Sequence, residues 1–333
     1  MLKRRFRYVI LLPVLGAVAL LAGCETTTAQ RQGGASRPPV SPATLKPQAM
    51  DILRQSLRHE NPYLRNHAVE VVAETRQREM FSDIIGLMDD ETIAVRFSAT
   101  VAAGQMRCYG CETQVRDRLE DADENVQLAA AYSMVKLGYP DYHDRLRQAI
   151  DHRDQTARAN AVLLLGKLGD RDDLDLLYQA MRDDRSSERV KIQAIESIAR
   201  LGDTRMYRSK LWALLISKYA DDRVMGIRGM GALGTEEAQK AIATMLSDDV
   251  QEVRLCAAEQ LGRLGDLSGR DEVARFFAQN ANLDQDDVAA VMAVMAIGRI
   301  AAPELTGYLP QALDSRSEIV RLIAAQSVLL LAL

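Results

Sequence analysis

Val253-Arg-Leu-Cys-Ala-Ala-Glu-Gln-Leu-Gly-Arg-Leu-Gly-Asp266 is the clearest copy of a pattern that recurs along most of this 333-residue chain. An apolar residue opens the pattern and a basic residue usually follows it. An alanine comes four places after the opening residue, and Leu-Gly closes the pattern eleven places after it. Recurrence at this length indicates a repeat architecture instead of separate domains, because each unit must bury its apolar face against the next.

The opening residue returns at a regular spacing. Eight gaps cover the 256 residues from Leu64 to Val320, so the mean period is 32. Eight of the nine copies have alanine four places on, which lets a neighbouring helix approach closely. We assign the opening residues to Leu64, Val95, Val126, Ala157, Val190, Val224, Val253, Ala289 and Val320.

Each copy is expected to be the first helix of a two-helix unit. The closing glycine suits the left-handed residue that follows a helix C-terminus. After the turn, apolar residues fall at the i, i+3, i+4 and i+7 spacing of an amphipathic second helix. The clearest case is Leu174, Leu177, Tyr178 and Met181.

The copy that we open at Val224 is irregular. Its Leu-Gly comes nine places after the opening residue, and four glycines fall between Gly226 and Gly234. Each glycine inside a helix costs about 1 kcal/mol relative to alanine. The glycines are explained either by close helix packing or by a compliant joint in the stack.

The pattern resembles HEAT repeats, and in particular the short HEAT-like type first noted in phycobilisome lyases. The resemblance covers residues 46–333 and implies an all-α fold, an α-solenoid of about eight to nine two-helix repeats forming an armadillo-type superhelix. It carries no shared catalytic residues, and no pigment-handling residues can be matched here. The resemblance therefore implies a surface that binds proteins and not a particular reaction.

About nine layers spaced 8–10 Å apart predict a curved rod on the order of 80 Å long. We expect the second helices to line its concave surface. Residues 46–59 are expected to form an N-terminal cap on the first unit. At the other end, residues 320–333 form a very apolar first helix without a second one. That helix is covered either by a partner or by deep packing on the preceding pair.

The first residues predict the location of the protein. Residues 1–23 have the basic start and apolar run of a signal peptide, and they end in the Leu-Ala-Gly before Cys24. This ending resembles a bacterial lipobox, which implies diacylglycerol on the Cys24 sulfur and acyl chains such as palmitate. Residues 24–45 are predicted to be a lipidated cysteine followed by a disordered tether, because their composition cannot build a core. The protein is then lipid-anchored and extracytoplasmic, with the outer membrane facing the periplasm favoured over the inner membrane.

The charge of the chain argues against nucleic acid as a partner. The net charge is −4, and four basic residues lie in the leader, so the mature chain is near −8. Binding to nucleic acid depends on neutralising phosphates with basic side chains. We therefore expect a membrane anchor and an unknown envelope protein as the partners.

Cys108 and Cys111 replace the usual Leu-Gly-Asp turn of the second repeat. A turn brings residues three apart within disulfide reach, and thiols tend to oxidise outside the cytoplasm. A local disulfide is the preferred interpretation, and free thiols, a redox pair or half of a metal site are the alternatives. No second CxxC and no paired histidines follow, so we predict no metal, no cofactor and no catalytic residue.

Trp212 and Tyr219 flank an unusually apolar second helix. Aromatic residues often anchor protein interfaces, so these two form a candidate protein-binding patch, although a thick core would explain them equally well. The function predicted from the sequence is a lipid-anchored envelope scaffold or adaptor without enzymatic activity. The alternative is an extracytoplasmic enzyme, either a thiol redox protein acting through Cys108 and Cys111 or a lyase-like HEAT protein.

Overall fold

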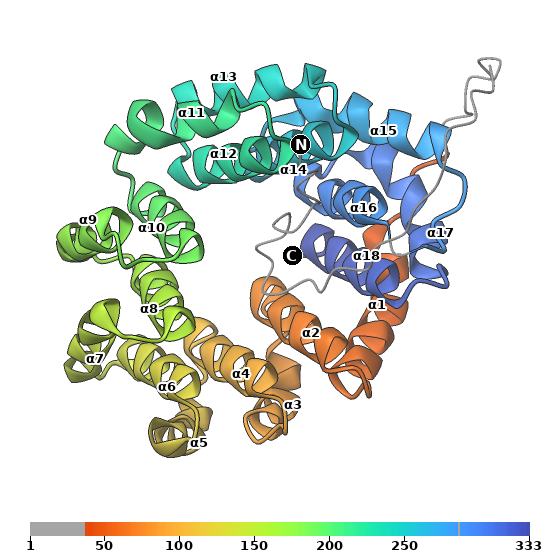
Figure 1. Ribbon diagram of the computed structural model, residues 1–333. Coiled ribbons are helices and arrows are strands. Elements are labelled where there is room, and N and C mark those ends of the chain that lie inside the picture. The colour runs from red at the N-terminus through yellow and green to blue at the C-terminus, as the bar shows by residue number, and fades with distance from the viewer. Residues whose placement is uncertain (1–36, 286) are drawn as a thin grey trace.

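The helices stack side by side into a closed ring and not into an open rod (Figure 1). The structure is a computed structural model that describes residues 37–285 and 287–333. The predicted signal peptide, Cys24 and the first part of the tether lie outside the described residues. Within those residues there is no strand, which agrees with the predicted all-α solenoid. None of the helices in this part of the chain has the length and apolar character needed to cross a membrane.

The ring has an inner and an outer row of helices (Figure 1). In the described residues the inner row is α2 (Pro62–Thr75), α4 (Ile93–Gln105), α6 (Glu124–Leu137), α8 (Gln155–Leu168), α10 (Glu188–Arg200), α12 (Ala220–Leu233), α14 (Gln251–Arg263), α16 (Val288–Ile300) and α18 (Glu318–Leu331). The outer row is α1 (Pro42–Leu57), α3 (Phe81–Leu87), α5 (Glu112–Asp117), α7 (His143–Gln148), α9 (Leu174–Arg182), α11 (Trp212–Leu215), α13 (Glu236–Thr244), α15 (Arg270–Gln279) and α17 (Leu309–Leu313).

Glycine ends the inner helices where the Leu-Gly signal predicted it. The five glycines have φ between +68° and +109°, the left-handed region that an L side chain rarely adopts. Their amides close the last helical turn, as when Gly169 N donates to Leu165 O at 3.3 Å. The prediction is confirmed at Gly138, Gly169, Gly202, Gly234 and Gly265.

The first helix of each unit lines the inside of the ring, so the expectation that the second helices line the concave surface is wrong. The reason is the size of the side chains between neighbouring first helices. A Cβ added at Gly104 would lie 2.5 Å from the Cα of Ser133, and one at Gly298 would lie 2.6 Å from the Cα of Ser327. Helices separated by glycine, alanine and serine approach more closely than the bulkier outer row, and the stack curves toward them.

Helix α1 closes the ring. It packs along α18 and also contacts α2, and it takes the position of the second helix that α18 lacks. Leu53 and Leu57 of α1 are almost fully buried, as are Val328 and Leu329 of α18. The apolar C-terminal helix is thus covered by the N-terminal helix as well as by α16 and α17. The predicted role of residues 46–59 as a cap on the first unit alone is therefore incomplete.

Polar contacts join the same two ends of the chain. Gln48 Nε2 donates to Asp314 Oδ1 at 2.8 Å, and His59 Nε2 lies 3.1 Å from Glu318 Oε1. On the inner side, the Glu74 carboxylate of α2 accepts hydrogen bonds from two residues of the last repeats, which are Arg299 and Gln326. The seam between α1 and α18 is therefore held by an apolar contact with polar contacts at its edges.

The predicted boundary of the tether is wrong. Helix α1 begins at Pro42, and the extended residues before it lie against the ring. Val40 N donates to Thr306 Oγ1 at 2.9 Å, and the Arg37 guanidinium lies 5.4 Å from the centre of the Tyr308 ring. Contacts with a distant part of the chain order these residues, which composition could not reveal. Residues 37–45 thus belong to the folded body, although we assigned them to the disordered tether 24–45.

In four units the arginine after the opening residue pairs with an acid in the turn before the next inner helix, and we call these pairs the arginine ladder. Arg65 donates to both Asp90 oxygens at 2.7 and 2.8 Å, and Arg96 donates to both Asp121 oxygens at 3.0 Å. In both pairs the acid lies 25 residues ahead, in the turn before the next inner helix. The same spacing recurs in Arg158–Asp183 and Arg223–Asp248.

The pair made by Arg223 corrects the register of the irregular repeat. If Arg223 follows the opening residue, the repeat opens at Asp222 and not at Val224. Leu233 then lies eleven places on, as in the other units, and Gly226 takes the alanine position. The sequence misled because an aspartate stands where every other unit has an apolar residue.

The glycines of this repeat allow close packing against the preceding outer segment. A Cβ added at Gly226 would lie 2.7 Å from the backbone nitrogen of Leu215 in α11. One added at Gly231 would meet the side chain of Gln260 in α14. Of the two explanations considered for these glycines, the structure supports close packing.

We expect Gly226→Ala to lower the free energy of unfolding by about 1–3 kcal/mol, because the added methyl group overlaps backbone that cannot move aside cheaply. Gly86→Ala is the matched control, since a Cβ there meets nothing within 4 Å. It should leave stability unchanged or raise it by up to about 1 kcal/mol, by restricting the unfolded chain. Thermal and urea unfolding followed by circular dichroism measure both. Equal effects of the two substitutions would contradict the close approach.

The ladder carboxylates predict how stability changes with pH. Burial alone would raise the pKa of Asp121, but hydrogen bonds from Arg96 and from the backbone outweigh it and hold the pKa below its usual range. A carboxylate with a lowered folded pKa stabilises the fold above its unfolded pKa of about 4, and this contribution is lost as the pH falls through the folded value. Asp121→Asn should therefore cost about 3 kcal/mol at neutral pH, and less in acid.

The control for this substitution is Asp89→Asn. The Asp89 side chain is 71% exposed and pairs with Arg118 at 2.8 Å, whereas the Asp121 side chain is 5% exposed. An exposed ion pair contributes about 0–1 kcal/mol, so Asp89→Asn should change stability little at any pH. Urea unfolding at a series of pH values compares the two. A pH-independent difference between Asp121→Asn and the unsubstituted protein would show that the carboxylate charge is not the cause.

Candidate functional site

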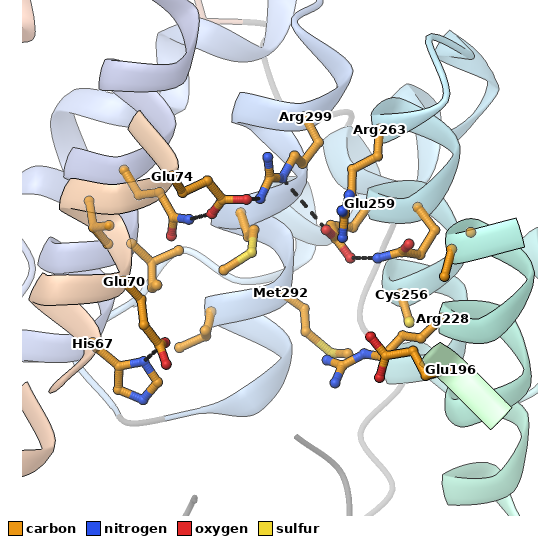
Figure 2. Close-up of a pocket in the computed structure, with 18 of the residues that line it drawn as sticks. His67, Glu70, Glu74, Glu196, Arg228, Cys256, Glu259, Arg263, Met292 and Arg299 are labelled. Atoms are coloured by element: carbon orange, nitrogen blue, oxygen red, sulfur yellow. Dashed lines mark hydrogen bonds and ion pairs between the residues drawn. The ribbon is translucent and has the colours of Figure 1, made fainter. Parts of the chain in front are cut away.

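A cavity of about 310 Å³ lies on the inner side of the ring and is lined by α2, α10, α12, α14, α16 and α18 (Figure 2). We call it the lumen cavity. If the opening residue of each repeat is position 0, its lining residues come mainly from positions 3, 6, 7 and 10. That spacing marks a single face of each inner helix. The lumen cavity therefore exists because the ring brings the same face of six helices together.

One wall of the lumen cavity is apolar. Met292 and Met295 of α16, Ile323 of α18 and Val71 of α2 are among its apolar lining residues. Figure 2 shows Met292 between the side chains of α2 and those of α12 and α14. Methionine and aliphatic side chains present a surface that can pack against the apolar part of a ligand.

The acidic groups of the lumen cavity are already paired. Arg299 bonds to Glu74 and lies 3.7 Å from Glu259, so it links α16 to α2 and to α14 (Figure 2). Gln260 Nε2 donates to Glu259 Oε2 at 2.5 Å. Elsewhere in the cavity, Glu196 accepts from Arg200 at 2.6 Å. Glu70 is the remaining acid of the lining, and its partner is the His67 ring.

Two guanidinium groups and one imidazole nitrogen have no such partner. Among the described residues, neither Arg228 nor Arg263 forms an ion pair. His67 is 2% exposed and its Nδ1 lies 3.2 Å from Glu70 Oε2, while its Nε2 is buried without a hydrogen-bond partner. Since a carboxylate only accepts, Nδ1 is the donor of this contact, and Nε2 is left without a partner.

The lumen also perturbs two titratable groups. Burial raises the pKa of the Cys256 thiol to about 12, although the charges of Arg228 and Arg263 act in the opposite direction. Burial lowers the pKa of Lys167 on α8, and the positive charge of Arg200 lowers it further. Cys256 is therefore a poor nucleophile, and its burial indicates a role in packing.

Sequence reasoning missed the lumen cavity, although a signal for it was present. Position 10 of the repeat, just before the closing leucine in most units, is basic in five of the nine copies. The more conspicuous basic residue of the repeat is the arginine at position 1, which makes the ladder. The basic residues at position 10 are Lys136, Lys167, Arg200, Arg263 and Arg299.

The predicted protein-binding patch lies on the outside of the ring. Trp212 is 43% exposed and Tyr219 is 52% exposed, and Ile216 between them is 63% exposed. The leucines of the same segment, Leu211 and Leu215, are buried in the core. The structure thus separates the two readings of this apolar segment, because its leucines form core while its aromatic residues face outward. Sequence reasoning missed Ile216, which is one helical turn beyond Trp212.

Cys108 and Cys111 lie at the turn after α4. The structure joins them in a disulfide with their Cα atoms 5.3 Å apart. Both residues are buried, at 3% and 0% exposure. A buried pair offers little access to a protein substrate, so this geometry favours a structural disulfide over a redox site.

The His143 ring lies beside two aspartates. His143 Nε2 is 2.7 Å from Asp173 Oδ2, and Asp170 is close to the same ring. Arg147 Nε also donates to Asp173 at 2.7 Å. The arginine charge satisfies the buried carboxylate and would repel a cation, so this cluster is explained as an ion-pair network.

With this geometry established, a family model for HEAT repeats matches residues 112–199. The chain is built of HEAT-like repeats. No curated protein matches the sequence.

Several solved structures are similar in fold. The complex of CpcE and CpcF of phycocyanin lyase from Nostoc sp. PCC7120 has 18% identity over 83% of this chain and 99% of that chain, with a TM-score of 0.43. Human deoxyhypusine hydroxylase in complex with glycerol has 17% identity over 78% and 99%, with a TM-score of 0.38. Kap95p bound to RanGDP has 11% identity over 82% and 43%, with a TM-score of 0.34. These are likenesses of fold alone.

The cysteine arrangement predicts a definite count of reactive thiols. In a chain carrying Cys24→Ser, no thiol should react with iodoacetamide in the native state, because Cys256 is 1% exposed and its pKa is raised. After unfolding without reductant, Cys256 alone should react. After unfolding with reductant, Cys108 and Cys111 should react as well. Mass spectrometry of the labelled peptides measures this, and labelling of all three without reductant would contradict the disulfide.

Proposed function

We propose that the protein is a lipid-anchored scaffold of the bacterial envelope that binds a partner protein on the outside of its ring. The HEAT-like solenoid is compatible with a scaffold or adaptor role. The proposal includes a lipid anchor at Cys24, an envelope location, the absence of enzymatic activity and a docking patch for the partner.

The observation that carries the proposal is the exposure of Trp212, Ile216 and Tyr219 together. Three of the eight large apolar side chains that are exposed in the described residues fall within this short stretch. Isolated exposed apolar residues are common on soluble proteins, but clustered aromatic ones are typical of protein interfaces. We call these three residues the α11 patch.

The α11 patch rests on a firm support. Leu211 and Leu215 anchor its segment in the core, and the Tyr207 ring lies 6.0 Å from the Trp212 ring. The close approach of Gly226 to the backbone at Leu215 fixes the segment further. A partner would therefore meet aromatic side chains that are held in place, which reduces the entropy lost on binding.

The anchor is supported by the sequence alone. The lipobox-like residues before Cys24 imply that this cysteine carries acyl chains. Two or more acyl chains attach a protein stably to a membrane. A redox enzyme is the less favoured alternative, because Cys108 and Cys111 are buried and joined.

The test is site-specific photo-crosslinking in intact cells. A photoreactive amino acid at position 216 should crosslink to one envelope protein in high yield. The same amino acid at position 93 is the control, since Ile93 is 45% exposed but lies on another part of the ring. Replacing Trp212 and Tyr219 together by alanine should weaken capture at position 216 at least ten-fold, because aromatic anchors dominate interface energies.

The anchor is tested in the same cells. Cys24→Ser should move the protein from the membrane fraction to the soluble fraction, while Cys256→Ser should leave it in place. Equal crosslinking from positions 216 and 93 would contradict the α11 patch. Retention of Cys24→Ser in the membrane fraction would contradict the lipid anchor without affecting the patch.

A further inference from the structure

We infer that the lumen cavity binds a small amphipathic anion, a carboxylate or phosphate on an apolar body, with the anionic group held by Arg228 and Arg263. This site is separate from the α11 patch, because it lies on the inner face of the ring. The inference does not depend on the proposed scaffold function.

The first argument is charge. Arg228 of α12 and Arg263 of α14 lie on adjacent inner helices, and both act on the electrostatics of Cys256 between them. Every acid that lines the lumen cavity has another partner, as described above. Two guanidinium groups without a carboxylate in a partly closed site repel each other, and a bound anion would relieve this repulsion.

The second, independent argument is His67. Its Nε2 is buried without a partner and the residue lines the lumen cavity on the side opposite to Arg228 and Arg263 (Figure 2). Buried polar atoms are nearly always satisfied, so an unsatisfied ring nitrogen in a cavity indicates a missing hydrogen-bond partner. A polar group on the ligand would supply it.

The apolar wall defines the rest of the ligand. Figure 2 shows Met292 between the two polar ends, and Met295 and Ile323 also line the lumen cavity. The volume of about 310 Å³ is at the lower end of small-molecule sites. A bare inorganic ion would leave this wall uncovered. A protein segment would need an open groove, which is why we commit to a small molecule.

Isothermal titration calorimetry at low ionic strength tests the inference. The full-length chain carries Cys24→Ser, so that no covalent lipid competes. The probes are decanoate, decyl phosphate, decanol and inorganic phosphate. We expect saturable one-to-one binding of decanoate or decyl phosphate, at least ten-fold tighter than binding of decanol or inorganic phosphate. Binding of one of the two anions alone would identify the head group.

Substitutions place the bound probe. Arg228→Gln and Arg263→Gln should each weaken binding at least ten-fold, because each removes a charge-assisted contact. Arg208→Gln is the matched control, since Arg208 is exposed on the outer segment before α11. Met292→Trp should abolish binding by filling the lumen cavity, and circular dichroism confirms that each variant keeps its helices.

Several results would overturn the inference. They are the absence of saturable binding for both decyl anions, equal binding of decanol, or equal binding of inorganic phosphate. Unchanged affinity in both arginine variants would do the same, and so would unchanged affinity in Met292→Trp.

Discussion

The packing of α1 against α18 is the contact on which the rest of this molecule depends. An open solenoid has two ends, and each end must hide an apolar face from water. In this ring each end hides the other, because the N-terminal helix supplies the outer helix that the last repeat lacks. The buried leucines of α1 provide the apolar part of this contact, and polar pairs such as His59 with Glu318 border it. Without it, six helix faces would not enclose a common space.

Closure also explains why charged residues lie in the middle of the protein. Small side chains between the inner helices draw those helices together, and the residues that point away from this packing must point into the lumen. Evenly spaced acids and arginines can pair across that space, as Arg299 does with Glu74 and Glu259. Arg228 and Arg263 are the groups that this pairing leaves over. The outer row faces ordinary solvent, where the aromatic residues after α10 stand out.

Much of the fold could be read from the sequence because it depends on local, repeated signals. The glycines that end five inner helices, the alanine position and the arginine ladder each recur in several units. Closure could not be predicted, since it depends on the sum of small rotations over nine units and on a contact between α1 and α18, which lie at opposite ends of the chain. The lumen cavity was missed for the same reason, although its basic column is visible in the sequence. The aromatic residues Trp212 and Tyr219 could be singled out, but their exposure required the structure.

The seam between α1 and α18 has a consequence for how such a protein can change in size. A linear array grows or shrinks by gene duplication or loss of one unit, and the remaining units still stack. A ring closed by a helix borrowed from its own beginning accepts only a number of units that brings the two ends into register. Adding or deleting one repeat would separate α1 from α18 or force every layer to rotate by a different angle. The repeat number of this protein is therefore fixed by geometry, as the blade number of a propeller is.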